Sequence, residues 1–491
     1  MLKRTCGKSF SFAVFAPEDR AFASKLKTLL LSYTESMRKD DPNDVLDLAT
    51  FMLYCSYVSC NADKLGLKEF DHTYSIDEAS ANLGNKYLAA GFIEYYAGLF
   101  AQSDALADLR GIAFRSSDLS NAISGWIKAL NASGLSLAER DDKMLSSVIW
   151  FALAQAHVSG VWGKNGHEFS TLPCIADLAA TLVDVKGKTT LDFACGNGTY
   201  LASALLGGAA SICGRDISER AVTKAKVSCF FADPTKRHDI AEMDAFESEA
   251  SMARAQCVFA APPFGMRLRR YDLQGKAYYA RVMASLLGDG AAPAPDAEDF
   301  FVAKSFDSLA DDGVAIVHVS SGFLFHQQKV RQSLRRALIE GGYLRAVVEL
   351  PGGCVPGSAV KSALLVIGKR PSSEGVLVVD LDSKGLPGRD YVIKGRGTCG
   401  ITEAGIAWLS EVVHQQEEIP AVSIVIDRQK LIDSGSNLCY STYGAAFDYK
   451  TALDQIRPVA EVVNDIKAVQ KEIDSLGKQI ADILDDIETK G

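Results

Sequence analysis

The sequence predicts an α/β protein built on a doubly wound, mostly parallel sheet. Between residue 189 and about residue 370, short apolar runs alternate with helical patterns, and such alternation is typical of parallel sheets covered by helices on both faces. The glycine-rich and acidic motifs of this region each follow a predicted strand, which is where such sheets bind ligands. The predicted strands are Thr190–Ala194, Ser211–Cys213, Cys257–Ala261, Val314–Val319, Arg345–Leu350 and Ala363–Ile367.

The composition is that of a globular protein with several domains. The chain has 491 residues, 48% of them hydrophobic, and a net charge of −9. This charge argues against a protein that coats nucleic acid by bulk electrostatics, but it allows a local basic track or a positively charged partner. The chain has no apolar run of about 18 residues and no signal-peptide pattern, so we expect a cytoplasmic protein without a membrane segment. Its eleven cysteines form no Cys-x-x-Cys pair, so no metal site is predicted.

Four regions are predicted along the chain. Residues 1–160 show helical periodicity and little strand alternation, which indicates a helical N-terminal domain. Residues 161–372 carry the α/β pattern and every motif described below. Residues 373–455 are a mixed C-terminal region, and residues 456–491 form a helical tail.

A glycine turn lies at the centre of the α/β region. The stretch from Thr189 to Leu205 reads as a strand, the turn Gly196-Asn197-Gly198 and a helix start, where a ligand can approach the backbone and its unpaired N–H groups. The third glycine of the dinucleotide-binding fingerprint is missing. Asp192 at the strand end would repel a pyrophosphate, so a cationic or hydroxyl-bearing ligand is favoured.

Two more acidic residues follow later strands. Asp216 ends the next short strand, at the spacing where an acid binds ribose hydroxyls in nucleotide-binding βαβ units. Asp244 lies one element further along, in Met243-Asp244-Ala245-Phe246. The glycine turn and these two acids together predict S-adenosylmethionine as the ligand.

A helix predicted from Ile175 to Leu182 follows the segment Phe169–Pro173. Ser170 or Thr171 can cap this helix. Alternatively, the helix start can receive an anionic group, such as the carboxylate of an amino acid.

The apolar run Val258–Ala261 is followed by Pro262-Pro263-Phe264. Two prolines fix φ twice and remove two backbone donors, so the carbonyl groups there stay available as rigid acceptors. Phe264 offers a flat face that suits a flipped base. Taken alone, the motif fits an ordinary turn with a core phenylalanine better. The neighbouring nucleotide-type unit favours the base-stacking interpretation.

Basic residues interleaved with tyrosines follow this turn. Such a pattern fits contacts with the phosphates of double-stranded DNA combined with stacking, and a solvated loop is the alternative. The predicted DNA-binding residues are Arg267, Arg269, Arg270 and Lys276.

The C-terminal tail carries a heptad pattern. Apolar residues alternate spacings of three and four over more than four heptads, which predicts a coiled-coil helix that buries its apolar face against another helix. That helix belongs either to a partner subunit, which we favour, or to the chain itself. The repeating positions are Val459, Val462, Ile466, Val469, Ile473, Leu476, Ile480, Ile483 and Ile487.

These motifs resemble the amino-methyltransferases of DNA, in particular the modification subunits of type I restriction-modification systems. The resemblance covers residues 160–370 well, the C-terminal tail moderately and the first 150 residues poorly. It implies a Rossmann-like methyltransferase sheet that transfers a methyl group from S-adenosylmethionine to the N6 amino group of adenine. The residues implied to bind the cofactor are Phe169, Ser170, Thr171, Asp192, Ala194, Gly196, Asn197, Gly198, Asp216, Ile217, Asp244 and Ala245.

The implied catalytic tetrad is Ala261, Pro262, Pro263 and Phe264. It departs from the family pattern, which is Asn-Pro-Pro-Phe or Asn-Pro-Pro-Tyr. In the family, the asparagine side chain and the following proline carbonyl accept hydrogen bonds from the target amino group. Alanine cannot accept such a bond, so we expect a loss of roughly 10²–10³ in rate, or about 3–4 kcal/mol.

The resemblance also implies partners. These are double-stranded DNA and a DNA-specificity subunit that packs on the C-terminal helix, with a second copy of the chain and a restriction subunit as further candidates. The first alternative function is a catalytically inactive, methyltransferase-like scaffold that binds DNA. A third interpretation, methylation of a protein amide or of RNA by the same chemistry, fits the basic-aromatic stretch and the helical tail less well.

Overall fold

The computed structural model describes most of the chain, and the first and last residues lie outside the described part. Within the described residues, no helix is long and apolar enough to cross a membrane. The described ranges are 17–37, 42–75, 91–99, 119–138, 145–160, 170–246, 254–268, 277–289, 296–444 and 466–477, with short gaps inside them and a few single positions between them.

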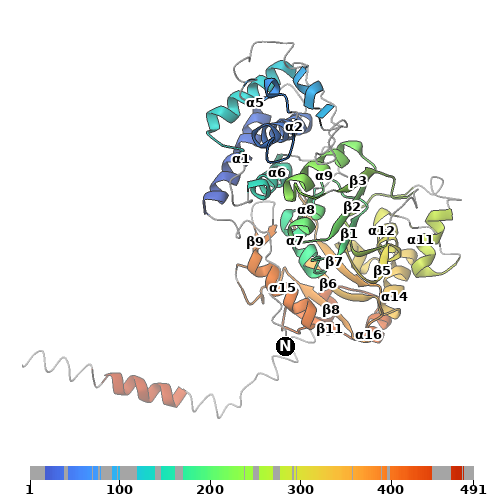
Figure 1. Ribbon diagram of the computed structural model, residues 1–491. Helices are drawn as coiled ribbons and strands as arrows, with labels where there is room; N and C mark the ends of the chain where they lie inside the picture. Colours follow the sequence, from blue (N-terminus) through green and yellow to red (C-terminus); the bar gives the residue numbers. More distant parts are fainter. Residues whose placement is uncertain are drawn as a thin grey trace, which may run out of the picture.

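A nine-stranded sheet forms the centre of the molecule (Figure 1). Its strand order is β11-β8-β6-β7-β5-β4-β1-β2-β3. β7 pairs antiparallel with β5 and β6, and β11 pairs antiparallel with β8, whereas the other pairs are parallel. The predicted mostly parallel sheet is therefore confirmed. The strands are β1 (Thr189–Asp192), β2 (Ser211–Asp216), β3 (Asp239–Glu242), β4 (Ala255–Ala260), β5 (Leu309–Ser320), β6 (Leu344–Leu350), β7 (Ser362–Gly368), β8 (Val376–Asp380) and β11 (Ser423–Ile426).

Helices cover both faces of the sheet, as the doubly wound prediction requires. Buried residues of α7, α8, α9 and α15 share one hydrophobic core with one face, and buried residues of α11, α12, α13, α14 and α16 share a second core with the other face. These helices are α7 (Pro173–Leu182), α8 (Thr199–Leu206), α9 (Glu219–Ala232), α11 (Ala277–Leu287), α12 (Ala297–Asp307), α13 (Ser321–Phe325), α14 (Lys329–Glu340), α15 (Glu403–Gln415) and α16 (Arg428–Asp433).

Side chains of the central strands alternate between the two cores. In β4, Cys257 and Phe259 belong to the core that contains α8, whereas Val258 and Ala260 belong to the core that contains α12. In β5, Ile316 belongs to the core that contains α8, and Val317 belongs to the core that contains α12. Because a strand has a side-chain period of two, this alternation fixes which face each neighbouring residue points to.

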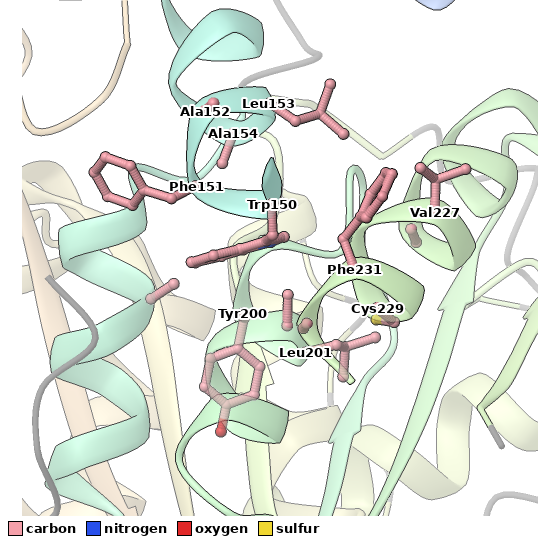
Figure 2. Packing of buried hydrophobic residues seen from close by; sticks show 14 of the residues in the cluster. Trp150, Phe151, Ala152, Leu153, Ala154, Tyr200, Leu201, Val227, Cys229 and Phe231 are labelled. Carbon is pink, nitrogen blue, oxygen red and sulfur yellow. The ribbon is translucent and has the colours of Figure 1, made fainter. Parts of the chain in front are cut away.

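Helices from the N-terminal part of the chain pack on α9 at one end of the sheet (Figure 1). Trp150 of α6 is fully buried, and Figure 2 shows it between Tyr200 of α8 and Phe231 of α9. Tyr54 and Tyr57 of α2 contact Phe231 edge to face, with ring centroids 5.8 and 5.2 Å away. The N-terminal elements are α1 (Pro17–Ser36), α2 (Pro42–Asn61), the 3-10 helix η2 (His72–Tyr74), α5 (Leu119–Ser133) and α6 (Leu145–Gly160).

Two features lie outside the large sheet. A small antiparallel pair, β9 (Val392–Lys394) and β10 (Cys399–Ile401), contacts α7 through β10. Residues 466–477 of the predicted tail are helical, and each of them is exposed. The remaining heptad positions lie outside the described residues.

Candidate active site

A cavity of about 350 Å³ opens at the carboxyl ends of the parallel strands. Its walls come from the segments that follow β1, β2, β3 and β4, together with the end of β5 and the loop after β6. Among the predicted site residues, the lining includes Ser170, Thr171, Ala194, Gly196, Asn197, Asp216, Ile217, Asp244, Ala245, Ala261, Pro262, Pro263 and Phe264.

Asp216 lines the cavity, and backbone hydrogen bonds hold its carboxylate in place. Its carboxylate accepts a hydrogen bond from the Gly196 backbone at 2.9 Å and another from the Ser218 backbone at 3.0 Å. Gly196 has a φ of +50°, which explains the glycine in this turn. The two backbone bonds hold the carboxylate in one orientation, and a carboxylate has further lone pairs that can accept ligand hydroxyls.

The Ser170 segment is tied to the glycine turn. Asn197 Nδ2 donates to Ser170 Oγ at 2.8 Å, so the two stretches form one wall. The alternative in which Ser170 or Thr171 caps the following helix is wrong, because Leu172 is the N-cap of α7 and makes no side-chain cap bond. The leucine side chain has no acceptor atom, and the helix begins at Pro173, one residue after Leu172, so Ser170 and Thr171 lie before the cap position.

Two predicted cofactor residues lie outside the cavity lining. Asp192 is only 2% exposed and accepts a hydrogen bond from the Ala194 backbone at 3.0 Å. Burial, opposed by this bond and reinforced by the charge of Asp216, raises the pKa of Asp192 to about 8. Gly198 begins α8 with a φ of +73°, and a Cβ there would lie 2.7 Å from Cα of Ala225. Both residues therefore support the backbone of the glycine turn without lining the cavity.

Asp244 lies in a loop that a buried lysine supports. The carboxylate of Asp244 accepts a hydrogen bond from the Phe246 backbone at 2.8 Å. Lys304 of α12 donates to the Ala245 carbonyl at 2.5 Å, and its ammonium lies 5.2 Å from the centre of the Phe193 ring. Burial lowers the pKa of Lys304 to about 8, although the charge of Asp244 opposes this shift. No sequence motif pointed to this role of Lys304.

The Ala261–Phe264 segment follows β4, which pairs with β1, and forms another part of the cavity wall. Pro262 is buried, whereas Ala261, Pro263 and Phe264 are half-buried. Phe264 lines the cavity, and its ring meets the His318 ring edge to face, with centroids 5.3 Å apart. Phe264 is therefore partly accessible from the cavity rather than sealed in the core.

The predicted DNA-binding residues are only partly described. Arg267 is exposed, close to the cavity residue Met266. Arg269, Arg270 and Lys276 lie outside the described residues, as does Phe169 among the predicted cofactor residues. On α14, Arg331 and Arg335 are buried, whereas Lys329 and Arg336 are exposed.

Several lining residues were missed by the sequence analysis. His318 lies next to the last residue of the predicted strand Val314–Val319, so its position near a carboxyl end was a usable signal. Arg220 and Lys224 come from α9, where helical periodicity alone does not distinguish a ligand-facing cation from a solvated one. The other missed residues are Phe193, Cys195, Thr199, Ser218, Ala221, Met243, Phe246, Met266, Phe301, Cys354, Val355 and Pro356.

Comparison with known proteins gives a family match over more than half of the chain. The family described as N-6 DNA Methylase matches residues 152–451. The methylase subunit of the type I restriction enzyme MpnII from Mycoplasma pneumoniae is 21% identical over 351 residues. The alignment covers 66% of this chain and 61% of that subunit, so the chain spans less than two thirds of its relative's length.

Solved structures share the fold. The methyltransferase subunit of a type I restriction-modification system from Streptococcus thermophilus matches with a TM-score of 0.65 and 17% identity, over 85% of this chain and 98% of that one. A modification subunit assigned to a type I restriction enzyme of Vibrio vulnificus matches with a TM-score of 0.59 and 16% identity, over 82% and 92%. At these identities the likeness concerns the fold alone.

Proposed function

Because the chain belongs to the N-6 DNA methylase family, we propose that it transfers a methyl group from S-adenosylmethionine to the N6 amino group of adenine in DNA. We further propose that it acts as the modification subunit of a type I-like restriction-modification complex. The observation that carries the proposal is the shared cavity. One hollow joins the anchored carboxylate of Asp216 to the Pro262-Pro263-Phe264 wall.

The residues of the cavity fit S-adenosylmethionine. The carboxylate of Asp216 is held by two backbone donors and suits ribose hydroxyls. Ile217, Ala245 and Phe246 offer apolar surface for an adenine ring, next to the carboxylate of Asp244. The Ser170 segment offers hydroxyl groups to the amino-acid end. A volume of about 350 Å³ is within the usual range of small-molecule sites, about 300–1,000 Å³.

The Pro262 wall supports the acceptor half of the reaction. When bound, S-adenosylmethionine supplies a methyl group on a sulfonium. The N6 nitrogen forms a bond to that methyl carbon, the sulfur keeps the electron pair of the broken bond, and the nitrogen then loses a proton to water. A rigid proline carbonyl can orient the amino group, and the Phe264 ring can stack on the extruded base. Ala261 supplies no hydrogen bond, so the proposed activity is impaired by about 10²–10³.

Ala261 also favours a second function. A chain that keeps the cavity but lacks the family asparagine can serve as a DNA-binding scaffold without modifying the DNA. This alternative predicts that cofactor and DNA bind while no methyl group is transferred, even after Ala261→Asn.

We propose partner contacts on two surfaces. Exposed Arg267 is available for a DNA phosphate near the mouth of the cavity. Ile466, Val469, Ile473 and Leu476 form one apolar stripe on the tail helix, each between 51% and 63% exposed. Spacings of three and four on an exposed helix support docking of a helical DNA-specificity subunit.

The test measures cofactor binding and methyl transfer for the native chain and for Ala261→Asn. Both proteins are produced together with their native partners and assayed on unmodified genomic DNA, with adenine identified as the modified base. We expect both to bind S-adenosylmethionine and the variant to be about 10²–10³ faster. Absence of cofactor binding in both would contradict the proposed function. Binding without transfer in the Asn variant would support the scaffold instead.

A further inference from the structure

His318 and Ala261 lie side by side at the wall of the cavity. Ala260 of β4 and Val317 of β5 are register partners, and the next residues along these parallel strands are Ala261 and His318. Ala261 packs on the same core as Phe259 and Ile316, which places Ala261 and His318 on one face of the sheet. Adjacent strands are about 4.8 Å apart, so the imidazole adjoins the position where the alanine lacks a polar group.

The His318 ring is held in place from two sides. Its Nε2 lies 2.9 Å from Oγ of Ser362, which is 1% exposed on β7. The Phe264 ring meets it edge to face at an interplanar angle of 86°. The fixed ring therefore belongs to the same wall as the proposed base-stacking residue.

The ring is also neutral. His318 is 5% exposed, and burial lowers its pKa to about 4. A neutral imidazole has one donor and one acceptor nitrogen. When Nε2–H donates to Ser362, Nδ1 keeps its lone pair. Among the described residues Nδ1 makes no hydrogen bond, and His318 lines the cavity.

We propose that His318 positions the target base, with Nδ1 accepting the hydrogen bond from the amino group that Ala261 cannot accept. This inference rests on the proposed function and names a group that the family pattern of the tetrad does not include. His318 serves as a hydrogen-bond acceptor only, and the departing proton goes to water. Ser362 is a positioning residue, because its hydroxyl holds the ring through Nε2 and leaves Nδ1 on the other side of the ring.

The first test reads the tautomer without any turnover. The full chain is labelled with ¹⁵N-histidine, and the His318→Gln spectrum identifies the His318 signals among the seven histidines. At neutral pH we expect the hydrogen on Nε2 and an unprotonated Nδ1. A single-stranded oligonucleotide containing adenine should shift the Nδ1 signal, whereas the same oligonucleotide with purine in place of adenine should not. A hydrogen on Nδ1, or equal shifts with both oligonucleotides, would overturn the inference.

The second test is a double-mutant cycle on positions 261 and 318. With the native Ala261, His318→Phe keeps the aromatic packing and should slow methyl transfer at least about tenfold, while His318→Gln, which retains an acceptor, should stay within about threefold. In the Ala261→Asn background, His318→Phe should have an effect of less than about threefold, because the asparagine supplies the acceptor. The matched control is His414→Phe, at an exposed site on α15 outside the cavity lining.

The outcomes separate this inference from the proposed function. Equal losses from His318→Phe in both backgrounds, or no loss in either, would reject the role of His318 while methyl transfer by Ala261→Asn still stands. If Ala261→Asn transfers no methyl group, the proposed function fails. In that case, an unshifted Nδ1 signal with the adenine oligonucleotide would reject the His318 contact as well.

Discussion

At the scale of single residues, Asp216 is the group on which the cofactor site depends. Two backbone N–H groups orient its carboxylate toward the cavity, so an amide in its place would lose charge and turn an N–H₂ group toward one of those donors. We expect Asp216→Asn to weaken S-adenosylmethionine binding about 10- to 100-fold, the loss of a charge-assisted hydrogen bond of roughly 1.5–3 kcal/mol. Titration calorimetry measures this change. Exposed Asp311, outside the cavity lining, provides the control Asp311→Asn. Equal affinities of parent and Asp216→Asn would contradict the assignment.

Asp177 of α7 gives a prediction about stability. It is 3% exposed, and burial raises the pKa of its carboxyl from 3.8 to about 7. Between about pH 4 and pH 7 the unfolded chain therefore holds fewer protons than the folded chain, so this group lowers the free energy of unfolding as the pH rises. Above about pH 7 both states are ionised and the cost is constant, on the order of a few kcal/mol.

The Asp177→Asn variant removes this titration. Its melting temperature minus that of the parent should rise steadily from about pH 4 to pH 7 and stay flat above. Differential scanning calorimetry over this range measures the difference. A difference that does not change with pH would show that Asp177 ionises normally in the folded protein.

Much of the site could be predicted at this scale, because strand ends and glycine turns leave a local signature. Asp216, Gly196 and the Pro262-Pro263 pair each line the cavity from such a position. His318 and Lys304 could not be assigned a role, because their importance depends on neighbours far away in the chain. The contact of Lys304 with Ala245 spans 59 residues, and that of His318 with Ser362 spans 44.

At the scale of elements, α2 is joined to the cavity through charges. Asp47 of α2 pairs with the Arg220 guanidinium and lies 3.6 Å from Nζ of Lys224, and Arg220 also pairs with Asp44 at 2.9 Å. Both cations line the cavity. Helix α2 therefore holds the side chains of Arg220 and Lys224, which line the proposed cofactor site.

Asp47→Asn should weaken both stability and cofactor binding. Because Asp47 is buried but the Arg220 side chain is 40% exposed, we expect a loss of about 1–2 kcal/mol in the free energy of unfolding. The affinity for S-adenosylmethionine should change in the same variant, since Arg220 and Lys224 lose their anchor. Urea unfolding and calorimetry measure the two effects. Asp63→Asn, exposed at the end of the same segment, is the control. A stability loss without any change in affinity would argue against this coupling.

The strands show where prediction from sequence stops. The six predicted strands correspond to β1, β2, β4, β5, β6 and β7, whereas the short strands β3 and β11 were not predicted. Each has four residues, and only Ile240 of β3 is buried, so neither offers a readable alternation. The reversed direction of β7 was also not predicted, because a strand buried along its whole length has the same pattern in either direction. The short connection from Leu350 to Ser362 was the available signal, since a parallel crossover needs about a dozen residues or more.

At the scale of the whole molecule, the N-terminal helices and the sheet share one hydrophobic core. The cluster runs from Leu26 and Tyr54 through Trp150 and Phe231 to Phe259 in β4. A continuous core of this kind predicts that the helices and the sheet unfold together.

Trp150 tests this shared core. Trp150→Ala should destabilise the protein by about 3–5 kcal/mol, because it empties a fully buried site between α6, α8 and α9, and Trp150→Phe should cost less. Far-UV circular dichroism and loss of S-adenosylmethionine binding should report the same midpoint in urea for each variant. Binding that survives after part of the helical signal is lost would indicate that the N-terminal helices unfold separately.

The central claim is that one cavity holds the methyl donor next to the base-binding wall. A crystal structure of the full chain with S-adenosylhomocysteine tests it most directly. We predict that the ribose hydroxyls bond to Asp216 and that the sulfur faces the wall formed by Ala261, Pro262 and His318. A ligand bound elsewhere, or bound with its ribose away from Asp216, would contradict the account.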